Sequence, residues 1–530
     1  MSTIALWGLI VAGIVVLTPL ADRVRVPLPV LLTLFGIVLP LLPGTPELRL
    51  EPELVLPLVL PPLLFAATQR ATVREFREQA RPILLTAVGL TIASAALVAV
   101  LAHAAGAPWA VAWVLGAIVS PPDPVAATAV ARRLRLPGRV VTVLEGEGMF
   151  NDATALVLYH VAVAAVVAGS VTVGEVGLDL VLAVVVGVGT GLVGGWLGHR
   201  VLGRLHVPAA ETTVTIALPF AAYLGAEQLH GSGVLAVLTL GLVLRSVSHA
   251  SVTSGGWLLG RSVWEYADYL ITGLVFVLIG FELTSVLDDN PVASSALPLA
   301  IGVVVVLVVL RFVWLFPAVW LLERQLAGRA RAQGVPAEVA GIGAFTRRET
   351  VVMSWAGMRG VVTVASALAL PHVMSTGEDF PERSTVVFVG LVVVLATLVL
   401  QGLTLAPVVR WLGVGSTADE AAEVAVLREQ ATRAALDAVR ARDDVPRPVR
   451  EAVALQYEGY LTAQLALSEA RRAGDDAEGR FGQEVDALLR DAVEVERDVV
   501  VRARNDGAVS AHVADEVLAD VEARAVRDLD

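Results

Sequence analysis

Apolar residues fill most of the chain in long blocks from the N-terminus to about Trp411. Each block runs for roughly 17–25 residues before a short polar break, the length that a helix needs to cross the hydrocarbon core of a bilayer. The pattern predicts an all-α polytopic membrane protein with about thirteen transmembrane helices. The predicted spans are 4–20, 26–43, 53–68, 82–102, 108–131, 140–168, 176–199, 211–229, 232–249, 264–286, 296–322, 350–371 and 384–413.

The composition changes abruptly after Trp411. The last 120 residues hold 26 Asp and Glu against 15 Arg, which accounts for nearly all of the net charge of −12. Two stretches of this tail, 424–442 and 485–504, have the apolar period of amphipathic helices. We therefore expect a transmembrane domain at 1–413 and an acidic, soluble helical tail at 414–530.

The absence of cysteine and the character of the N-terminal block exclude certain kinds of site and segment. With no cysteine in the chain, disulfides and thiolate metal sites are excluded. The first apolar block, Ile4–Leu20, has no basic n-region and no convincing cleavage site. It is therefore expected to be a membrane helix, not a removed signal peptide.

Arginines in the short loops predict the orientation of the helices. The six loops that follow odd-numbered helices contain nineteen arginines, whereas the alternate loops contain only Arg49 and Arg383. Basic loops are retained on the cytoplasmic side of a membrane. We expect a multi-pass protein of the cell (plasma) membrane, with its N-terminus outside and its tail in the cytoplasm.

Two of the predicted helices are interrupted near their middle. The helix at 108–131 contains three prolines within SPPDPV, and the helix at 350–371 has a glycine on each side of Arg359. Unwound backbone in mid-membrane survives only inside protein or beside water. Because the two helices run in opposite directions, they favour two inverted repeats whose broken helices meet at a midplane site. Two unrelated kinks are the alternative interpretation.

Ionisable side chains gather within these predicted spans. Each charge at the bilayer centre costs at least about 2.5–3.5 kcal/mol, so each requires a partner or a function. The charged residues are Asp123, Glu145, Glu147, Asp152, Arg311 and Arg359. Glu147 and Asn151 are four residues apart and share a helix face, whereas Asp152 lies about 140° around the helix from Glu147.

Carboxylate, amide and carbonyl oxygens of this kind suit a hard cation such as sodium, and no cluster of His or Cys indicates a transition metal. Asp152 lies in an apolar helix without an adjacent arginine, so we expect it to bind the ion. Glu147 is more consistent with a structural ion pair, for which Arg311 and Arg359 are the candidates. Asp123 is either a ligand or a charge that neutralises the broken helix.

These motifs resemble the monovalent cation/proton antiporter superfamily, in its sodium/proton exchanger branch. Asp123-Pro124 is similar to the family's broken-helix Thr-Asp-Pro, and EGEGMFND at 145–152 is similar to its Glu-Gly-Glu-Ser-x-x-Asn-Asp. Further segments resemble the family in the same order along nearly the whole membrane portion. They are Leu60–Phe65, His230–Val237, Phe276–Leu283, Arg311, Trp355–Leu368 and Leu398–Val409.

The resemblance implies a core domain that moves against a dimerising panel, with Asp152 as the shared ligand of sodium and proton. It also implies that Asp123 and Asn151 line the site and that Glu147 pairs with an arginine. The Asn-Asp pair at 151–152, in place of two aspartates, is similar to the electroneutral members of the family.

Three positions depart from the family pattern. Pro122 stands where the family usually has Thr, Gly148 where a Ser often contributes a ligand, and Ala66 where many members have an acidic residue. The site therefore has fewer side-chain ligands than the family pattern, which leaves the choice among sodium, lithium and potassium open.

The expected function is secondary antiport of sodium and protons by a homodimer in membrane lipid, for pH and sodium homeostasis, with no cofactor and no enzymatic activity. In this hypothesis a proton or a cation neutralises Asp152, never both, and only the neutral site crosses the membrane barrier. The alternatives are a potassium/proton antiporter, or a sensor or channel-like protein whose tail is the output domain. The tail has no nucleotide-binding glycine loop, no metal spacing and no basic patch for nucleic acid. A solvated helical bundle and a regulatory or dimer-supporting role both remain open for it.

Overall fold

A computed structural model of the chain describes residues 2–24, 26–42, 45–46, 52–70, 83–123, 127–128, 131, 134, 136–168, 173–288, 292–333, 345–374, 377–414, 420–472, 480–506 and six positions between 513 and 523. The chain forms two compact units, Met1–Ser416 and Thr417–Asp530.

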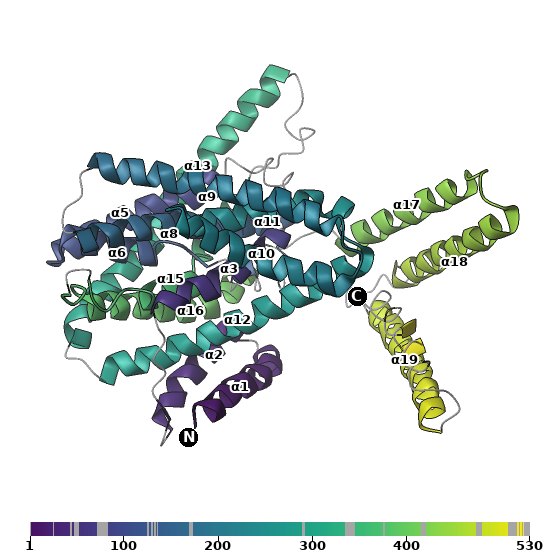
Figure 1. Ribbon diagram of the computed structural model, residues 1–530, viewed down its shortest axis with the longest axis horizontal. Helices are drawn as coiled ribbons and strands as arrows, with labels where there is room; N and C mark the ends of the chain where they lie inside the picture. The colour runs from purple at the N-terminus through teal and green to yellow at the C-terminus, as the bar shows by residue number, and fades with distance from the viewer. Residues whose placement is uncertain are drawn as a thin grey trace. The chain divides into compact units, whose positions relative to one another are not determined.

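Helices form nearly all of the described structure, which confirms the all-α prediction (Figure 1). Apart from one isolated bridge between Val373 and Asp379, no strand occurs in the described ranges. The first unit contains α1 (Thr3–Val24), α2 (Leu28–Val38), η1 (Leu39–Leu41), α3 (Pro52–Arg70), the π-helix η2 (Leu85–Leu90), α5 (Thr91–Ala104), α6 (Trp109–Val119), α8 (Gly138–Ala168), α9 (Val173–Leu202), α10 (Pro208–Gln228), α11 (Gly233–Ser251), α12 (Ser254–Asp288), α13 (Val292–Gln333), α14 (Arg347–Trp355), α15 (Val361–Leu368) and α16 (Arg383–Leu412).

Seven of the described helices are long and apolar enough to cross a membrane. They are the segments Ile4–Val24, Leu85–Ala104, Val140–Val167, Val181–Leu202, Ser254–Thr284, Ser295–Leu321 and Arg383–Leu412. Other predicted spans correspond to shorter apolar helices, to the more polar α10, or to the interrupted pair α14 and α15. The number of thirteen crossings therefore stays a prediction. So does the orientation, because several of the arginines that define it, among them Arg25, Arg74 and Arg132, lie outside the described residues.

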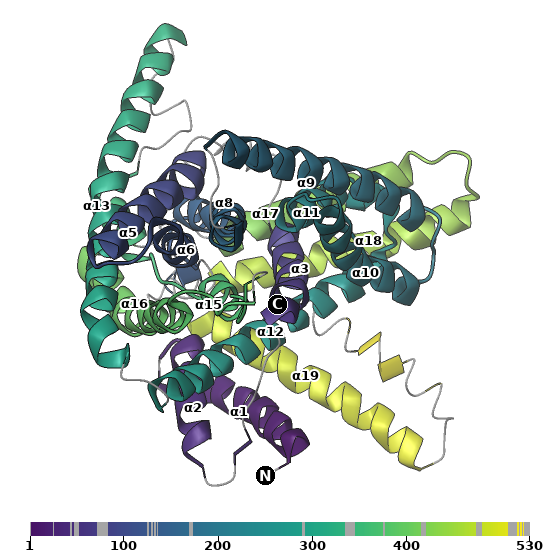
Figure 2. The same ribbon diagram turned by 60° about the vertical axis from the view of Figure 1, so that its left-hand side comes forward.

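The helices of the first unit pack as two bundles, which can be followed in Figures 1 and 2. In what we call the core bundle, α5, α6 and α8 pack in sequence, and α13 packs on α5, α14 and α16. In what we call the panel, α9 packs along α11, α12 packs along α2, and α10 contacts α9, α11, α12 and α3. The bundles meet where α3 and α12 of the panel contact α15 of the core bundle.

Both predicted interruptions are present in the core bundle. The helix predicted at 108–131 ends as α6 at Val119, and residues 120–123 are not helical; Pro124 lies outside the described residues. The helix predicted at 350–371 is divided into α14 and α15 by the non-helical residues 356–360. A capping box starts α14, because Thr346 Oγ1 accepts from Glu349 N at 3.2 Å and Glu349 Oε2 accepts from Thr346 N at 2.6 Å.

Two helices extend beyond the predicted membrane spans, although the apolar segment Ser295–Leu321 agrees with the span predicted at 296–322. The span predicted at 264–286 belongs to α12, which begins ten residues earlier, and the span predicted at 296–322 belongs to α13, which continues to Gln333. The added turns carry charged residues, and hydropathy alone ends a membrane span at such residues. In α13 the added residues 323–333 are rich in Arg, Gln, Leu and Ala, which favour helix, so that helix continues beyond its apolar segment. The added turns of α12 contain Gly255, Gly256 and Gly260, so helix propensity does not explain them.

The second unit is the acidic tail, and its described part is also helical. It contains α17 (Glu420–Arg440), α18 (Arg447–Arg472) and α19 (Arg480–Asn505). Helices α17 and α18 lie side by side (Figure 1), with Arg440 Nη2 2.5 Å from Glu458 Oε1. These helices confirm the prediction that the tail is helical.

Candidate cation site

The two broken helices are joined to each other through their non-helical segments. Asp123 N, in the segment after α6, donates to Met358 O, in the segment between α14 and α15, at 2.6 Å. A backbone amide released from a helix inside a membrane protein requires such a partner, because no lipid group can provide one. The interruption therefore forms a defined crossing of two chain segments that lie far apart in the sequence.

Arg359 stabilises this crossing from its centre. Its Nε donates to Val119 O, the last residue of α6, at 3.2 Å, and its Nη1 donates to Gly357 O. Its backbone N donates to Thr397 Oγ1 on α16 at 3.1 Å. The carboxyl end of a helix carries a partial negative charge, so a guanidinium at the end of α6 compensates that charge.

Asp123 lies against the start of α15. A Cβ atom on Gly360 would be only 1.6 Å from Asp123 Oδ2, so the carboxylate occupies the space beside a residue that has no side chain. Gly360 is the N-cap of α15. The amino end of a helix carries a partial positive charge, which attracts a carboxylate at this position.

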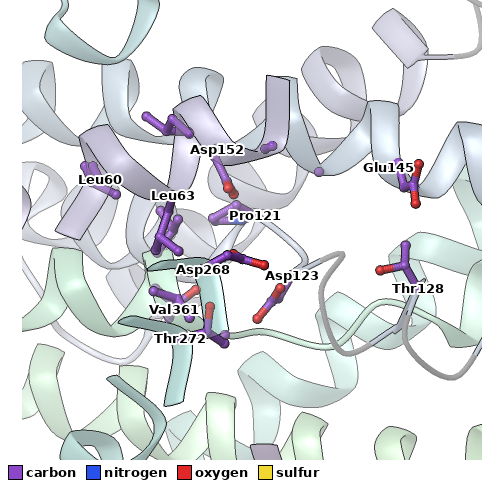
Figure 3. Close-up of a pocket in the computed structure, with 16 residues that line it drawn as sticks. Leu60, Leu63, Pro121, Asp123, Thr128, Glu145, Asp152, Asp268, Thr272 and Val361 are labelled. Carbon is purple, nitrogen blue, oxygen red and sulfur yellow. The ribbon is translucent and has the colours of Figure 1, made fainter. Parts of the chain in front are cut away.

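A cavity of about 90 Å³ lies beside the crossing, and Asp152 of α8 lines it together with Asp123. Figure 3 shows the Asp152 side chain pointing toward Pro121, with Asp123 and Asp268 nearby. Gly148, one helical turn before Asp152, lines the same cavity. A volume of this size has room for more than one water molecule.

Glu147 and Asn151 lie on a different face of α8. Together with Pro122 and Arg311 they line a separate space of about 10 Å³. Asn151 is fully buried, and its Nδ2 donates to Pro122 O at 2.8 Å. Neighbouring residues of a helix are about 100° apart, so Asn151 and Asp152 do not point into the same space. The structure therefore places Asn151 on the backbone of the broken helix and outside the residues that line the larger cavity.

Glu147 forms a two-point ion pair with Arg311 of α13. Arg311 Nη1 lies 2.5 Å from Glu147 Oε1, and Arg311 Nη2 lies 2.9 Å from Glu147 Oε2. Both side chains are 2% exposed. Arg311 Nε also donates to Met353 O of α14 at 3.1 Å. The pair thus links α8, α13 and α14.

Of the two arginines that were candidates for the ion pair with Glu147, Arg311 is the one that contacts its carboxylate among the described residues. Arg359 donates to backbone carbonyls instead. The physical reason is the broken helix α6, whose terminal carbonyl needs a donor that the interrupted backbone does not provide.

The sequence reasoning missed several residues that line the cavity. Asp268 and Thr272 come from α12 of the panel, and Thr363 comes from α15. Asp268 carried a signal that could have been used, because it is a carboxylate inside a predicted span. Threonine carried none, since helical threonines commonly bond to their own backbone.

Across the described residues, no group of three His, Cys, Asp or Glu side chains is arranged to hold a metal ion. The residues that line the cavity include the carboxylates of Asp123, Asp152 and Asp268 and the side chains of Thr272 and Thr363.

Comparisons with known proteins bear on the same region. A family model described as "Sodium/hydrogen exchanger, transmembrane" matches residues 10–411. An uncharacterized Na(+)/H(+) exchanger of Mycobacterium tuberculosis is 34% identical over 98% of this chain and 95% of the relative. The "Sodium, potassium, lithium and rubidium/H(+) antiporter" of Bacillus subtilis is 30% identical over 72% of this chain and 57% of the relative. The solved structure of the sodium proton antiporter MjNhaP1 from Methanocaldococcus jannaschii has a similar fold, with a TM-score of 0.59 and 18% identity over 77% of this chain and 98% of that one.

Proposed function

The chain belongs to the sodium/hydrogen exchanger family, and from this premise we propose that it exchanges sodium for protons across the cell membrane. Members of this family are transporters and not enzymes. The family is that of monovalent cation/proton antiporters.

One observation supports the proposal most directly: Asp152 and Asp123 line one cavity at the crossing of the two broken helices. A carboxylate in such a place has to be neutralised before it can cross a region of low dielectric constant. A proton and a cation both neutralise Asp152, and each excludes the other. Competition at one carboxylate is sufficient to couple the two fluxes.

Asp123 and Asn151 have supporting roles in this proposal. Asp123, beside the N-terminus of α15, remains ionised and attracts the cation. Asn151 holds the carbonyl of Pro122 and so maintains the shape of the site, while Pro122 and its neighbours supply backbone oxygens. Glu147 is cancelled by Arg311 and takes no part in exchange.

The arrangement of helices suggests how the site reaches both sides of the membrane. Asp152 and Asp123 belong to the core bundle, whereas the opposite wall of the cavity belongs to α3 and α12 of the panel. We propose that the core bundle moves against the panel in an alternating-access cycle. We also propose a homodimer with its N-terminus outside and its tail in the cytoplasm, serving pH and sodium homeostasis.

The proposed stoichiometry is one proton for each cation. We assign the exchanged proton to Asp152 alone, because Glu147 is paired and Asn151 is neutral. In this proposal Asp123 and Asp268, which line the same cavity, keep their charge. Such an exchange moves no net charge. A potassium/proton exchanger remains a second candidate, since the Bacillus relative is named for potassium, lithium and rubidium as well as sodium.

The test is cation-induced collapse of a pH gradient in everted membrane vesicles or proteoliposomes. Sodium should dissipate the gradient with the wild-type protein and not with Asp152→Asn, although that variant should be expressed and folded normally. A response to potassium alone would select the second candidate. Substantial exchange by Asp152→Asn would show that Asp152 is not the shared ligand.

A further inference from the structure

The family's usual side-chain ligands are missing at three positions of this chain, so other groups have to complete the shell of a cation. Pro122 and Gly148 provide no hydroxyl, and Ala66 provides no carboxylate. Ala66 also lines a different cavity, of about 330 Å³, with Phe65 and Gln69. The cavity that contains Asp152 must therefore draw any additional oxygen ligands from elsewhere in the fold.

Two threonine hydroxyls are placed to supply them. Thr272 of α12 and Thr363 of α15 both line the cavity. They are 9% and 1% exposed, and the Oγ1 atom of each is buried with no hydrogen-bond partner within the described part of the chain. A buried hydroxyl without a partner costs free energy, so its retention calls for an explanation.

Most other buried threonines of the described residues bond to their own helix; Thr91 of α5 is an exception that lies outside the cavity. Thr33 Oγ1 donates to Pro29 O at 3.0 Å, Thr284 Oγ1 donates to Gly280 O at 3.1 Å, and Thr397 Oγ1 donates to Val393 O at 2.8 Å. Each of these bonds reaches back one helical turn, as is common for threonine in helices. Thr272 does not make this bond although it lies well inside α12, whereas Thr363 lies in the first turn of α15 and is preceded four residues earlier by the non-helical Arg359.

Both threonines lie on helices that also bring carboxylates or their neighbours to the cavity. Thr272 lies one helical turn after Asp268, and Figure 3 shows both around the space that Asp123 also borders. Thr363 lies in the first turn of α15, three residues after the glycine that contacts Asp123. Hydroxyl and carboxylate oxygens are the ligands that a hard cation prefers.

We propose that Thr272 and Thr363 are ligands of the transported cation, and that their hydroxyls replace those missing at Pro122 and Gly148. The proposal rests on the proposed function. Thr363 belongs to the core bundle and Thr272 to the panel, so the complete shell forms only when the two bundles are close together on this side of the cavity.

Threonine-to-valine substitutions test this with little change in side-chain volume. In proteoliposomes, Thr272→Val and Thr363→Val should each raise the apparent KM for sodium about tenfold, because an oxygen that contacts a charged partner is lost. The maximal rate should change much less, since Asp152 still carries the proton. Thr284→Val, on the same helix as Thr272 but outside the cavity, is the matched control and should leave KM unchanged.

Two further measurements separate a ligand from a structural residue. Sodium should raise the Tm of the detergent-solubilised wild type and of Thr284→Val. For either cavity variant, the same rise in Tm should require about tenfold more sodium. Gly148→Ser in the Thr272→Val/Thr363→Val protein should recover part of the lost sodium affinity, because it restores a hydroxyl at the position where the family often has one.

The outcomes distinguish this proposal from the proposed function. Wild-type exchange with an unchanged KM in both valine variants would overturn the ligand role. So would a fall in maximal rate and in sodium-free Tm with KM constant, because that pattern indicates a packing role. If the wild type exchanges no cation, the proposed function fails, and the sodium dependence of Tm alone then decides whether the threonines bind the ion.

Discussion

Removing one member of the Glu147–Arg311 pair should destabilise the protein more than it impairs the transport chemistry. The two groups are bonded at two points, at 2.5 and 2.9 Å, and both are 2% exposed. Deleting either side chain leaves the other charge buried without its counter-ion, which costs about 3–5 kcal/mol. The mutual attraction itself is worth less, because both charges had to be desolvated to form the pair.

The assay is the Tm of purified protein in detergent. Glu147→Ala and Arg311→Ala should each lower Tm by about 5 °C or more. Glu147→Ala/Arg311→Ala should lose less than the sum of the two, since it strands no charge. Arg261→Ala is the matched control, because Arg261 and Glu265 form a pair at 2.8 Å that is largely exposed, and such pairs contribute little.

Two results would refute this reasoning. Strictly additive losses in the double variant would mean that the two side chains act independently. A Glu147→Ala protein that keeps the wild-type Tm and lacks only transport would identify Glu147 as a ligand of the cation.

Three further predictions concern the site itself. With potassium gradients clamped by valinomycin, the equilibrium sodium gradient should be the same at zero and at about −100 mV; a shift worth about 2.3 kcal/mol would mean that Asp123 releases a second proton alongside Asp152. Asp268→Asn should raise the apparent KM for sodium at least about threefold, because a charge facing the cavity is removed, and an unchanged KM in proteoliposomes would contradict that role. Arg359→Gln should lower Tm because it removes charged donors to the end of α6, worth about 1.5–3 kcal/mol each, and a wild-type Tm would argue against the capping role.

Much of the fold could be predicted because the chemistry that determines it is local. Apolar length locates membrane helices, and proline or glycine within such a length locates their interruptions. The end of α13 could not be predicted in this way, since helix propensity continues where apolarity stops. The start of α12 could not be predicted either, because its first turns contain three glycines, which do not favour helix. The non-helical segment between α14 and α15, residues 356–360, is longer than the two glycines near Arg359 indicate. Within it, Met358 O accepts from Asp123 N, a contact between segments that are distant in the sequence and therefore could not be predicted from either one.

The site was predictable in part for a related reason. Asp123 and Asp152 are conspicuous as charges among apolar residues, and the structure places both at one cavity. The face of Asn151 followed from helix geometry, but its bond to the carbonyl of Pro122 could not be predicted, because it joins segments that are distant in the sequence. Thr272 could not be singled out from the sequence. What distinguishes it is a buried hydroxyl that makes no bond to its own helix, and this can be seen only in the structure.

The contact between Gly360 and Asp123 has a consequence for how this protein tolerates change. The position of a Cβ at residue 360, 1.6 Å from a carboxylate oxygen, leaves no room even for alanine while Asp123 stays where it is. The constraint is steric and does not depend on which ion is carried. In a saturation-mutagenesis library selected separately for growth on sodium, lithium or potassium stress, residue 360 should therefore remain glycine under every regime. The residues enriched at positions 272 and 363 should differ among the three selections. Such an experiment therefore distinguishes residues that maintain the crossing of the broken helices from residues that determine ion selectivity.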